Sequence, residues 1–290
     1  MSAMTTPNLS TVDLPQGTIT YRVVGPATSE HPPVVFVHGM LVDSLLWTGV
    51  ADALAERGIR SYLPNWPLGS HRVPMHADAD LSPRGVARIV IDFLEAFDLT
   101  DVTLVGNDTG GAVCQFLIDT DHSRIGRLVL TNCDAFNNFP PEPFDTLFKL
   151  GRSKAVLKVM MASMRPTFLR HSALGFGLLL NDKPDPAVTR SWIEPCASDK
   201  LIRRDTVKTM KSVKPAELLD VASRLGEFDK PVQLVWGDAD RLFKLKFAER
   251  LAAAFPDATL TRIPGGRSFV PLEEPEQVGA AIAAMVVTRT

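Results

Sequence analysis

The run Leu104-Val105-Gly106-Asn107-Asp108-Thr109-Gly110-Gly111-Ala112 decides the fold expected for this chain. It has the form Gly-x-Asp-x-Gly and stands between a predicted buried strand and a predicted helix. A side chain at the tip of so sharp a turn needs small residues two positions away on both sides, which Gly106 and Gly110 provide. The dipole and free N–H groups of the helix favour a carboxylate there. The pattern predicts Asp108 as a nucleophile; the alternative is a tight turn in which Asp108 caps the helix.

Two further positions that follow predicted strands support the same site. His38-Gly39 comes directly after an apolar run, at a point where the backbone N–H groups of Met40 and Thr109 would converge on a developing negative charge. In this interpretation His38 orients the loop. Asp240 follows the strand predicted for residues 232–236, and ligands bind at the carboxyl ends of strands in open parallel sheets. These positions predict an oxyanion-binding loop and a supporting acid.

Apolar runs and helical patterns alternate toward both ends of the chain. Continuous apolar runs are typical of strands that are buried on both faces and therefore parallel. Between about 135 and 220 only helical patterns broken by prolines occur, including one over 166–180. Alternation on both sides of a helical insert predicts an α/β fold with a mostly parallel central sheet, helices on both faces and a helical cap. We expect the core over residues 1–135 and 221–290 and the cap over 136–220.

These motifs resemble those of the α/β-hydrolase superfamily, in particular its members with an aspartate nucleophile, such as haloalkane dehalogenases and epoxide hydrolases. The resemblance implies the order nucleophile, acid, late histidine. It also implies that the aspartate attacks carbon to form an ester, which histidine-activated water then hydrolyses. The resemblance covers nearly the whole chain and rests on His38-Gly39, Gly106 to Gly110, Trp236-Gly237 with Asp240, and Ile263-Pro264-Gly265-Gly266 leading into Pro271-Leu272-Glu273-Glu274-Pro275.

The family pattern breaks at its last catalytic position. The family usually reads Ile-Pro-Gly-x-x-His-Phe, whereas this chain reads Ile263-Pro264-Gly265-Gly266-Arg267-Ser268-Phe269. Ser268 therefore takes the place of the third catalytic residue, and a serine hydroxyl cannot act as a base near pH 7. Three histidines, His71, His76 and His171, are candidates to supply an imidazole from elsewhere in the chain.

Arg267 and the cap residue Trp192 are further candidates for binding. Arg267 stands next to Ser268 and could pair with Asp108 or Asp240, or bind an anionic substrate; the alternative is a solvated surface arginine. Trp192 could hold a halide ion; the alternative is a tryptophan that packs within the cap.

Several side chains that mark the dehalogenase and epoxide-hydrolase branches are replaced. Thr109 and Met40 stand where haloalkane dehalogenases usually have the tryptophan and asparagine that hold halide. Fluoroacetate dehalogenases carry an arginine where this chain has Thr109. Epoxide hydrolases protonate the epoxide with cap tyrosines, whereas Tyr21 and Tyr62 both lie outside the predicted cap. The substrate therefore does not follow from the resemblance.

Composition limits the partners and cofactors that we expect. The 290 residues carry a formal net charge of -2 at pH 7, which gives no basic surface for nucleic acid or anionic membranes. The sequence has neither a metal-ligand cluster nor a Gly-x-Gly-x-x-Gly motif, so we expect no metal and no cofactor. Residues 1–12 lack the apolar run of a secretory signal and the three cysteines form no CxxC pair, which favours a cytoplasmic location. The oligomeric state stays open.

Two hypotheses of different classes follow. The first is an enzyme of the α/β-hydrolase type that acts on a small, largely apolar substrate through Asp108, either by alkylation that stops after one turnover or by proton transfer or elimination. The second is a non-catalytic protein that binds a ligand in the retained pocket. A third possibility is that Ser268 was introduced by design to trap a complex. Restoring histidine at this position separates this last possibility from the other two.

Overall fold

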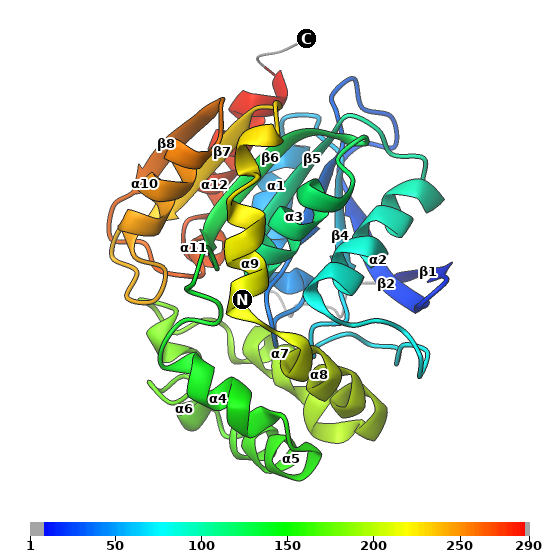
Figure 1. Cartoon of the computed structure of the whole chain (residues 1–290), viewed down its shortest axis with the longest axis vertical. Coiled ribbons are helices and arrows are strands. Elements are labelled where there is room, and N and C mark those ends of the chain that lie inside the picture. The colour runs from blue at the N-terminus through cyan, green and yellow to red at the C-terminus, as the bar shows by residue number, and fades with distance from the viewer. Residues whose placement is uncertain (1–8, 288–290) are drawn as a thin grey trace.

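The computed structural model describes residues 9–287, and a single sheet of eight strands forms the centre of this part of the chain (Figure 1). In spatial order the sheet runs β1-β2-β4-β3-β5-β6-β7-β8. β2 pairs antiparallel with β1 and β4, whereas every pair from β4 to β8 is parallel. The strands are β1 (Ser10–Leu14), β2 (Gly17–Val24), β3 (Val34–Val37), β4 (Ser61–Asn65), β5 (Val102–Asp108), β6 (Ile125–Cys133), β7 (Val232–Gly237) and β8 (Ala258–Ile263).

Helices cover both faces of the sheet, as the alternation of strand and helix patterns predicts. α1 and α12 pack together on one face, while α2 and α3 pack together on the other (Figure 1). Ser82 and Pro83 begin α2, because the Ser82 hydroxyl accepts the Gly85 N–H and proline fits the first turn. The core helices are η1 (Ser44–Trp47), α1 (Thr48–Ala55), α2 (Pro83–Ala96), α3 (Thr109–Thr120), α9 (Pro215–Ala222), η3 (Leu225–Glu227), α10 (Leu245–Ala254), α11 (Val270–Glu273) and α12 (Pro275–Val287).

The helical cap lies between β6 and α9 in the chain and forms the lower part of the molecule in Figure 1. The prediction of a single helix over 166–180 is wrong, because this segment forms two short helices, α6 and η2. A Cβ on Gly175 would lie 2.3 Å from the carbonyl oxygen of Arg170, so the chain folds back too tightly for a continuous helix. The cap elements are α4 (Phe144–Gly151), α5 (Lys154–Ser163), α6 (Thr167–Arg170), η2 (Phe176–Leu178), α7 (Pro186–Ser198) and α8 (Lys200–Ser212).

The end of the cap lies earlier in the chain than residue 220. α9 packs against the core helix α3. Just beyond α9, the guanidinium of Arg224 forms an ion pair with Asp119 of α3, with 2.7 Å between Nε and Oδ1. By these contacts α9 belongs to the core, and the cap ends after α8. Across residues 9–287, none of the helices has both the length and the apolar character needed to cross a bilayer.

Candidate active site

Asp108 stands where β5 passes into α3, and its backbone φ of 55° is one that few residues other than glycine adopt. Backbone atoms crowd both neighbouring glycines. A Cβ on Gly110 would lie 2.2 Å from the carbonyl oxygen of Val37, and one on Gly106 would lie 2.8 Å from the Cα of Gly111. The Asp108 side chain makes no capping hydrogen bond to α3. The strained turn predicted from the glycine spacing is confirmed, and no side-chain capping hydrogen bond supports the alternative.

A cavity of about 80 Å³, here called the Asp108 cavity, opens between the core and the cap. Asp108 and Thr109 are the polar side chains in its lining. Met40 also lines it, so the two residues expected to donate oxyanion N–H groups both lie at this cavity. The rest of the lining is apolar and comes from core loops and from the cap: Leu41, Pro140, Pro141, Phe144, Phe148, Phe176, Leu179, Leu242 and Phe243.

His38 fixes the loop that faces the carboxylate. Its Nε2 accepts the Trp66 N–H at 2.9 Å, so Nδ1 carries the proton and donates to the carbonyl oxygen of Gly39 at 3.0 Å. Burial lowers the pKa of His38 to about 4, which keeps the imidazole neutral. A Cβ on Gly39 would lie 2.2 Å from Oδ2 of Asp108, so the loop backbone touches the carboxylate. These contacts give His38 the orienting position expected from the sequence.

Ser268 and Asp240 come together although 28 residues separate them. The Ser268 hydroxyl donates to Oδ1 of Asp240 at 3.0 Å, and both side chains are buried. The same carboxylate accepts the backbone N–H groups of Leu242 and Phe243 and the Nδ2 of Asn132. Burial nevertheless raises the pKa of Asp240. The serine thus stands beside the acid, where a catalytic histidine would be oriented in the family that the motifs resemble.

The loop of Ser268 is also tied to the turn of Asp108. Nδ2 of Asn107 donates to the carbonyl oxygen of Ser268 at 2.8 Å. Burial raises the pKa of Asp108 to about 7, and the negative charge of Asp240 adds to this effect. The backbone N–H and the hydroxyl of Thr109 oppose it by stabilising the ionised form.

Asp134 is a second acid beside the turn that the sequence interpretation missed. It follows β6, and its backbone N–H donates to the carbonyl oxygen of Asp108 at 3.3 Å. Its carboxylate is fully buried, and the hydroxyl of Thr109 is the hydrogen-bonding group that stabilises its ionised form. Burial, and next to it the charge of Asp108, raise the pKa of Asp134 well above its usual range. The signal available in the sequence is an acid directly after a buried strand, since β6 ends at Cys133.

None of the six histidines, all of which lie within residues 9–287, lines the Asp108 cavity. His71 is buried, with Nε2 3.3 Å from Oδ2 of Asp205. Nδ1 of His76 contacts the carbonyl oxygen of Pro15, and Nε2 of His171 contacts the Thr189 hydroxyl. The expectation that one of these three could supply an imidazole is not met by their positions.

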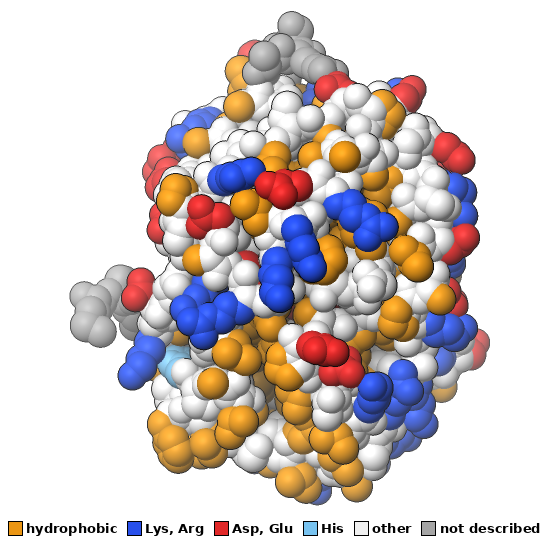
Figure 2. Space-filling view, turned by 60° about the vertical axis from the view of Figure 1, so that its left-hand side comes forward, with side chains coloured by type: hydrophobic (Ala, Val, Ile, Leu, Met, Phe, Trp, Pro, Cys, Tyr) orange, Lys and Arg blue, Asp and Glu red, His pale blue; other side chains and the backbone are white. Residues whose placement is uncertain are grey.

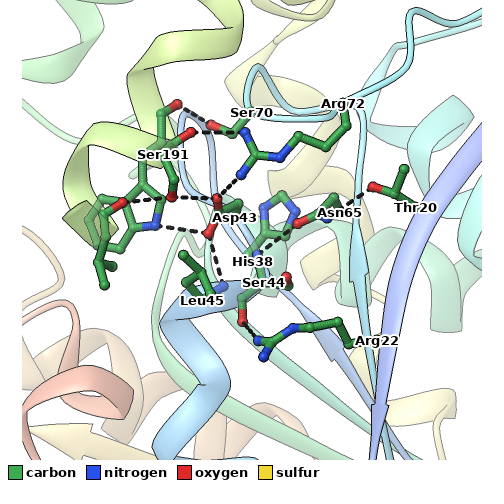
Figure 3. A network of polar contacts seen from close by, with 12 residues as sticks. Thr20, Arg22, His38, Asp43, Ser44, Leu45, Asn65, Ser70, Arg72 and Ser191 are labelled. Carbon is green, nitrogen blue, oxygen red and sulfur yellow. Dashed lines mark hydrogen bonds and ion pairs between the residues drawn. The ribbon is translucent and has the colours of Figure 1, made fainter. Parts of the chain in front are cut away.

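Trp192 is held by a buried polar network at the junction of core and cap. Figure 3 shows Asp43 at the centre of this network. At the centre of this network, the carboxylate of Asp43 accepts from Arg72 at 2.5 Å and from the Ser191 hydroxyl at 2.7 Å. The indole N–H of Trp192 also donates to Asp43, at 3.1 Å, and the ring packs edge-on against Phe176. Trp192 does not line the Asp108 cavity, so the halide-binding role is corrected to the packing alternative.

Arg267 matches neither expectation. Its Nη1 donates to the carbonyl oxygen of Leu180 at 2.7 Å, and its side chain is half-buried rather than solvated. No hydrogen bond or ion pair joins it to Asp108 or Asp240, and it does not line the Asp108 cavity. It links the loop of Ser268 to the cap. Over the part of the chain that the structure describes, no three His, Cys, Asp or Glu side chains are grouped so as to hold a metal ion.

Comparisons with known proteins find relatives that match most of the chain. Haloalkane dehalogenase 2 of Mycobacterium bovis is 26% identical over 263 residues, which cover 87% of this chain and 86% of that protein. The 2-hydroxy-6-oxononadienedioate/2-hydroxy-6-oxononatrienedioate hydrolase 1 of Dechloromonas aromatica is 26% identical over 240 residues, or 78% and 77% of the two chains.

Solved structures show the same fold. The haloalkane dehalogenase DbeA from Bradyrhizobium elkani superposes with a TM-score of 0.78 at 17% identity, covering 97% of this chain and 98% of that one. A putative ancestral haloalkane dehalogenase superposes with a TM-score of 0.77 at 20% identity, covering 97% and 99%. The family model described as the alpha/beta hydrolase fold matches residues 32–275. This chain therefore belongs to the α/β-hydrolase fold family, and its relatives are hydrolases.

Proposed function

We propose that this protein is an α/β-hydrolase-fold enzyme that takes an alkyl group from a small, largely apolar substrate onto Asp108. One observation carries the proposal: Asp108 stands on a strained turn at an apolar cavity, while Ser268 occupies the position beside the supporting acid. The similarity to proteins named haloalkane dehalogenase supports a halogenated substrate.

The proposed step is a displacement at carbon. A carboxylate oxygen of Asp108 forms a bond to the substrate carbon while the carbon–halogen bond breaks, and the halide leaves with the electron pair. The product is an ester on Asp108. Its hydrolysis needs a base that takes a proton from water, and the Ser268 hydroxyl instead donates its proton to Asp240. Because no histidine lines the cavity, the ester persists.

The lining of the Asp108 cavity also bears on the leaving group. It contains no indole, and Thr109 is the one side chain in it that can donate a hydrogen bond when Asp108 is ionised. The departing halide therefore depends on Thr109 and on backbone N–H groups. We expect iodide and bromide, which leave readily, to react faster than chloride.

Intact-protein mass spectrometry after incubation with 1-iodohexane tests the proposal. We expect a mass gain of one hexyl group per chain, located on the peptide that carries Asp108. The Asp108→Asn variant is the matched control, because it keeps the size of the side chain and removes the nucleophile. An equal gain in this variant, or no gain in the wild type, contradicts the proposal.

Alkylation is expected to depend on pH with a midpoint near 7. Only the ionised carboxylate attacks, and the pKa of Asp108 is raised to about 7 by burial and by Asp240. The rate should rise about tenfold from pH 6 to pH 8 and level off above, as for one group of this pKa. The check is the rate of adduct formation by mass spectrometry at fixed 1-iodohexane. A rate that is flat from pH 5 to pH 9 would show that the carboxyl ionises in its ordinary range.

The raised pKa of Asp108 also favours a second candidate, a non-catalytic ligand-binding protein. A neutral carboxyl at the end of an apolar cavity can donate a hydrogen bond to a ligand that is then released unchanged. This candidate predicts that haloalkanes raise the melting temperature without any gain in mass. The same incubation therefore separates the two functions.

A further inference from the structure

One stretch of the cap is strongly cationic, although the whole chain has a formal net charge of -2. From residue 146 to residue 181 the sequence contains six Lys and Arg residues and neither Asp nor Glu. The expectation that the chain has no basic surface rests on the net charge, which averages over this uneven distribution. Five of the six cationic side chains are exposed, namely those of Lys149, Arg152, Lys154, Lys158 and Arg165.

The two lysines of α5 have no acidic partners. Lys154 and Lys158 are four residues apart, so they lie next to each other on one face of this helix. In the part of the chain that the structure describes, neither forms an ion pair. Like charges at this spacing destabilise a helix, and Lys154 also stands in the first turn, where the helix dipole disfavours a positive charge. An anionic partner that neutralises both lysines would remove these costs.

Large apolar side chains are exposed among these cations. Phe168 is 75% exposed, Leu174 is 74% exposed and Val159 is 69% exposed. Leu150 and Val156 are exposed as well, so this segment contributes five of the nine large hydrophobic side chains that are exposed within residues 9–287. Val156 and Val159 are three residues apart on α5 and therefore share one face. Exposed apolar surface is thus concentrated in the same segment as the cations.

The elements that carry these side chains lie together at the lower end of the molecule, where Figure 1 shows α4, α5 and α6. α4 packs against α5. Leu174 lines a hollow together with Phe148 of α4 and Met160 and Met164 of α5, which places the segment after α6 beside these two helices. Figure 2 shows hydrophobic side chains at this end, with Lys and Arg side chains on both sides of them. Residues 149–174 thus form one surface, here called the basic cap surface.

We propose that the basic cap surface binds the surface of a membrane that contains anionic lipids. A lipid surface suits both kinds of side chain, because the cations reach the lipid phosphates while the exposed apolar side chains enter the boundary of the acyl chains. Nucleic acid also offers phosphates, but its bases stack on aromatic rings rather than on the valine and leucine side chains exposed here. The proposal does not depend on the proposed function. Such binding would bring the cap to the phase in which small apolar compounds accumulate.

Co-sedimentation of the full chain with lipid vesicles tests the proposal. Vesicles of phosphatidylcholine with about 30% phosphatidylglycerol are compared with vesicles of phosphatidylcholine alone, at about 0.1 M NaCl. We expect the partition coefficient to be at least about tenfold higher for the anionic vesicles. Most of this difference should disappear at about 1 M NaCl, because the screening length then falls to roughly 3 Å.

The double variant Lys154→Gln, Lys158→Gln is expected to lower the partition coefficient on anionic vesicles about 25-fold. Each lysine near an anionic lipid surface contributes about fivefold. The matched control is Arg57→Gln with Lys230→Gln, which removes two positive charges from the core and should leave binding unchanged. Arg57 precedes β4 and Lys230 precedes β7, at the amino ends of parallel strands. The cap lies at the opposite end of the sheet, over the carboxyl end of β5 at Asp108.

The double variant Phe168→Ser, Leu174→Ser tests the apolar contribution separately. It should lower partitioning onto anionic vesicles at least about tenfold, because the serines have no apolar surface to bury in the lipid.

Three results overturn the proposal: sedimentation with neither kind of vesicle, equal binding to both kinds, or an equal loss in the lysine variant and in the core control. A dimer in light scattering by a protein that does not bind anionic vesicles overturns it as well, and identifies a second copy of the chain as the partner of this surface.

Discussion

Replacing Ser268 with histidine is expected to turn a protein that stops after one alkylation into one that turns over repeatedly. The Ser268 hydroxyl lies 3.0 Å from Oδ1 of Asp240, so an imidazole at this position can have one nitrogen oriented by that carboxylate. Asn107 ties the same loop to the turn of Asp108 at 2.8 Å, which brings the second nitrogen near the ester. A general base contributes roughly 10²–10⁴-fold. We expect hydrolysis of the adduct to accelerate by at least about 100-fold.

The rate of adduct loss after removal of 1-iodohexane, followed by intact mass, measures this effect. Ser268→Asn is the matched control, because asparagine is close to histidine in size and polarity but cannot take a proton from water near pH 7. If Ser268→His folds, forms the hexyl adduct and keeps it as long as the wild type does, then the missing imidazole is not what stops the reaction.

Arg72→Met is expected to lower the free energy of unfolding by about 2–4 kcal/mol, as for a buried carboxylate that loses its cationic partner. Asp43 is fully buried, whereas 28% of the Arg72 side chain is exposed. We therefore expect a smaller loss in the free energy of unfolding than a completely buried ion pair would give. Arg72 lowers the pKa of Asp43 against the larger effect of burial, which raises it. Without Arg72 the folded-state pKa rises further, and stability is then lost as pH rises through that value. The loss should therefore be greater at pH 8 than at pH 5.

Urea unfolding of a double-mutant cycle with Asp43→Asn measures this coupling. Asparagine keeps an oxygen to accept the Trp192 and Leu45 N–H groups but removes the charge. The double variant should therefore be more stable than Arg72→Met alone. Additive losses would show that the ion pair does not hold the carboxylate. Because Ser191 and Trp192 belong to the cap, this network fixes the cap over the cavity (Figure 3).

Most of the core could be predicted from local patterns. The strands at 10–14 and 34–37 and the helix at 275–287 stand where apolar runs, turn residues and prolines place them. The cap segment 166–180 could not be predicted in the same way. Its helical spacing is real, but close contacts of Gly175 and Gly177 with the backbone of residues 170–172 bend the chain. Such contacts arise only when the segment folds back on itself.

In the candidate site, too, local patterns predict some features, whereas others depend on tertiary contacts. The glycine spacing predicts the strained turn at Asp108. The resemblance implies a supporting acid at Asp240 and a third catalytic position at Ser268, and the two side chains form a hydrogen bond. The burial of the Asp134 carboxyl depends on how β6 packs beside the turn, which no local pattern contains. The indole N–H of Trp192 donates a hydrogen bond to Asp43, 149 residues earlier in the chain. This pairing follows from the packing of the cap against the core and not from a local pattern.

The stoichiometry of halide release shows directly whether the reaction at Asp108 stops after one alkylation. With excess 1-bromohexane at pH 8, we expect one bromide to be released per chain at the rate at which the adduct forms, followed by almost none. The Asp108→Asn variant should release no bromide above the rate in buffer. Bromide that continues to appear over many equivalents per chain would contradict the account, because it would show that the unaltered site hydrolyses its ester without an imidazole.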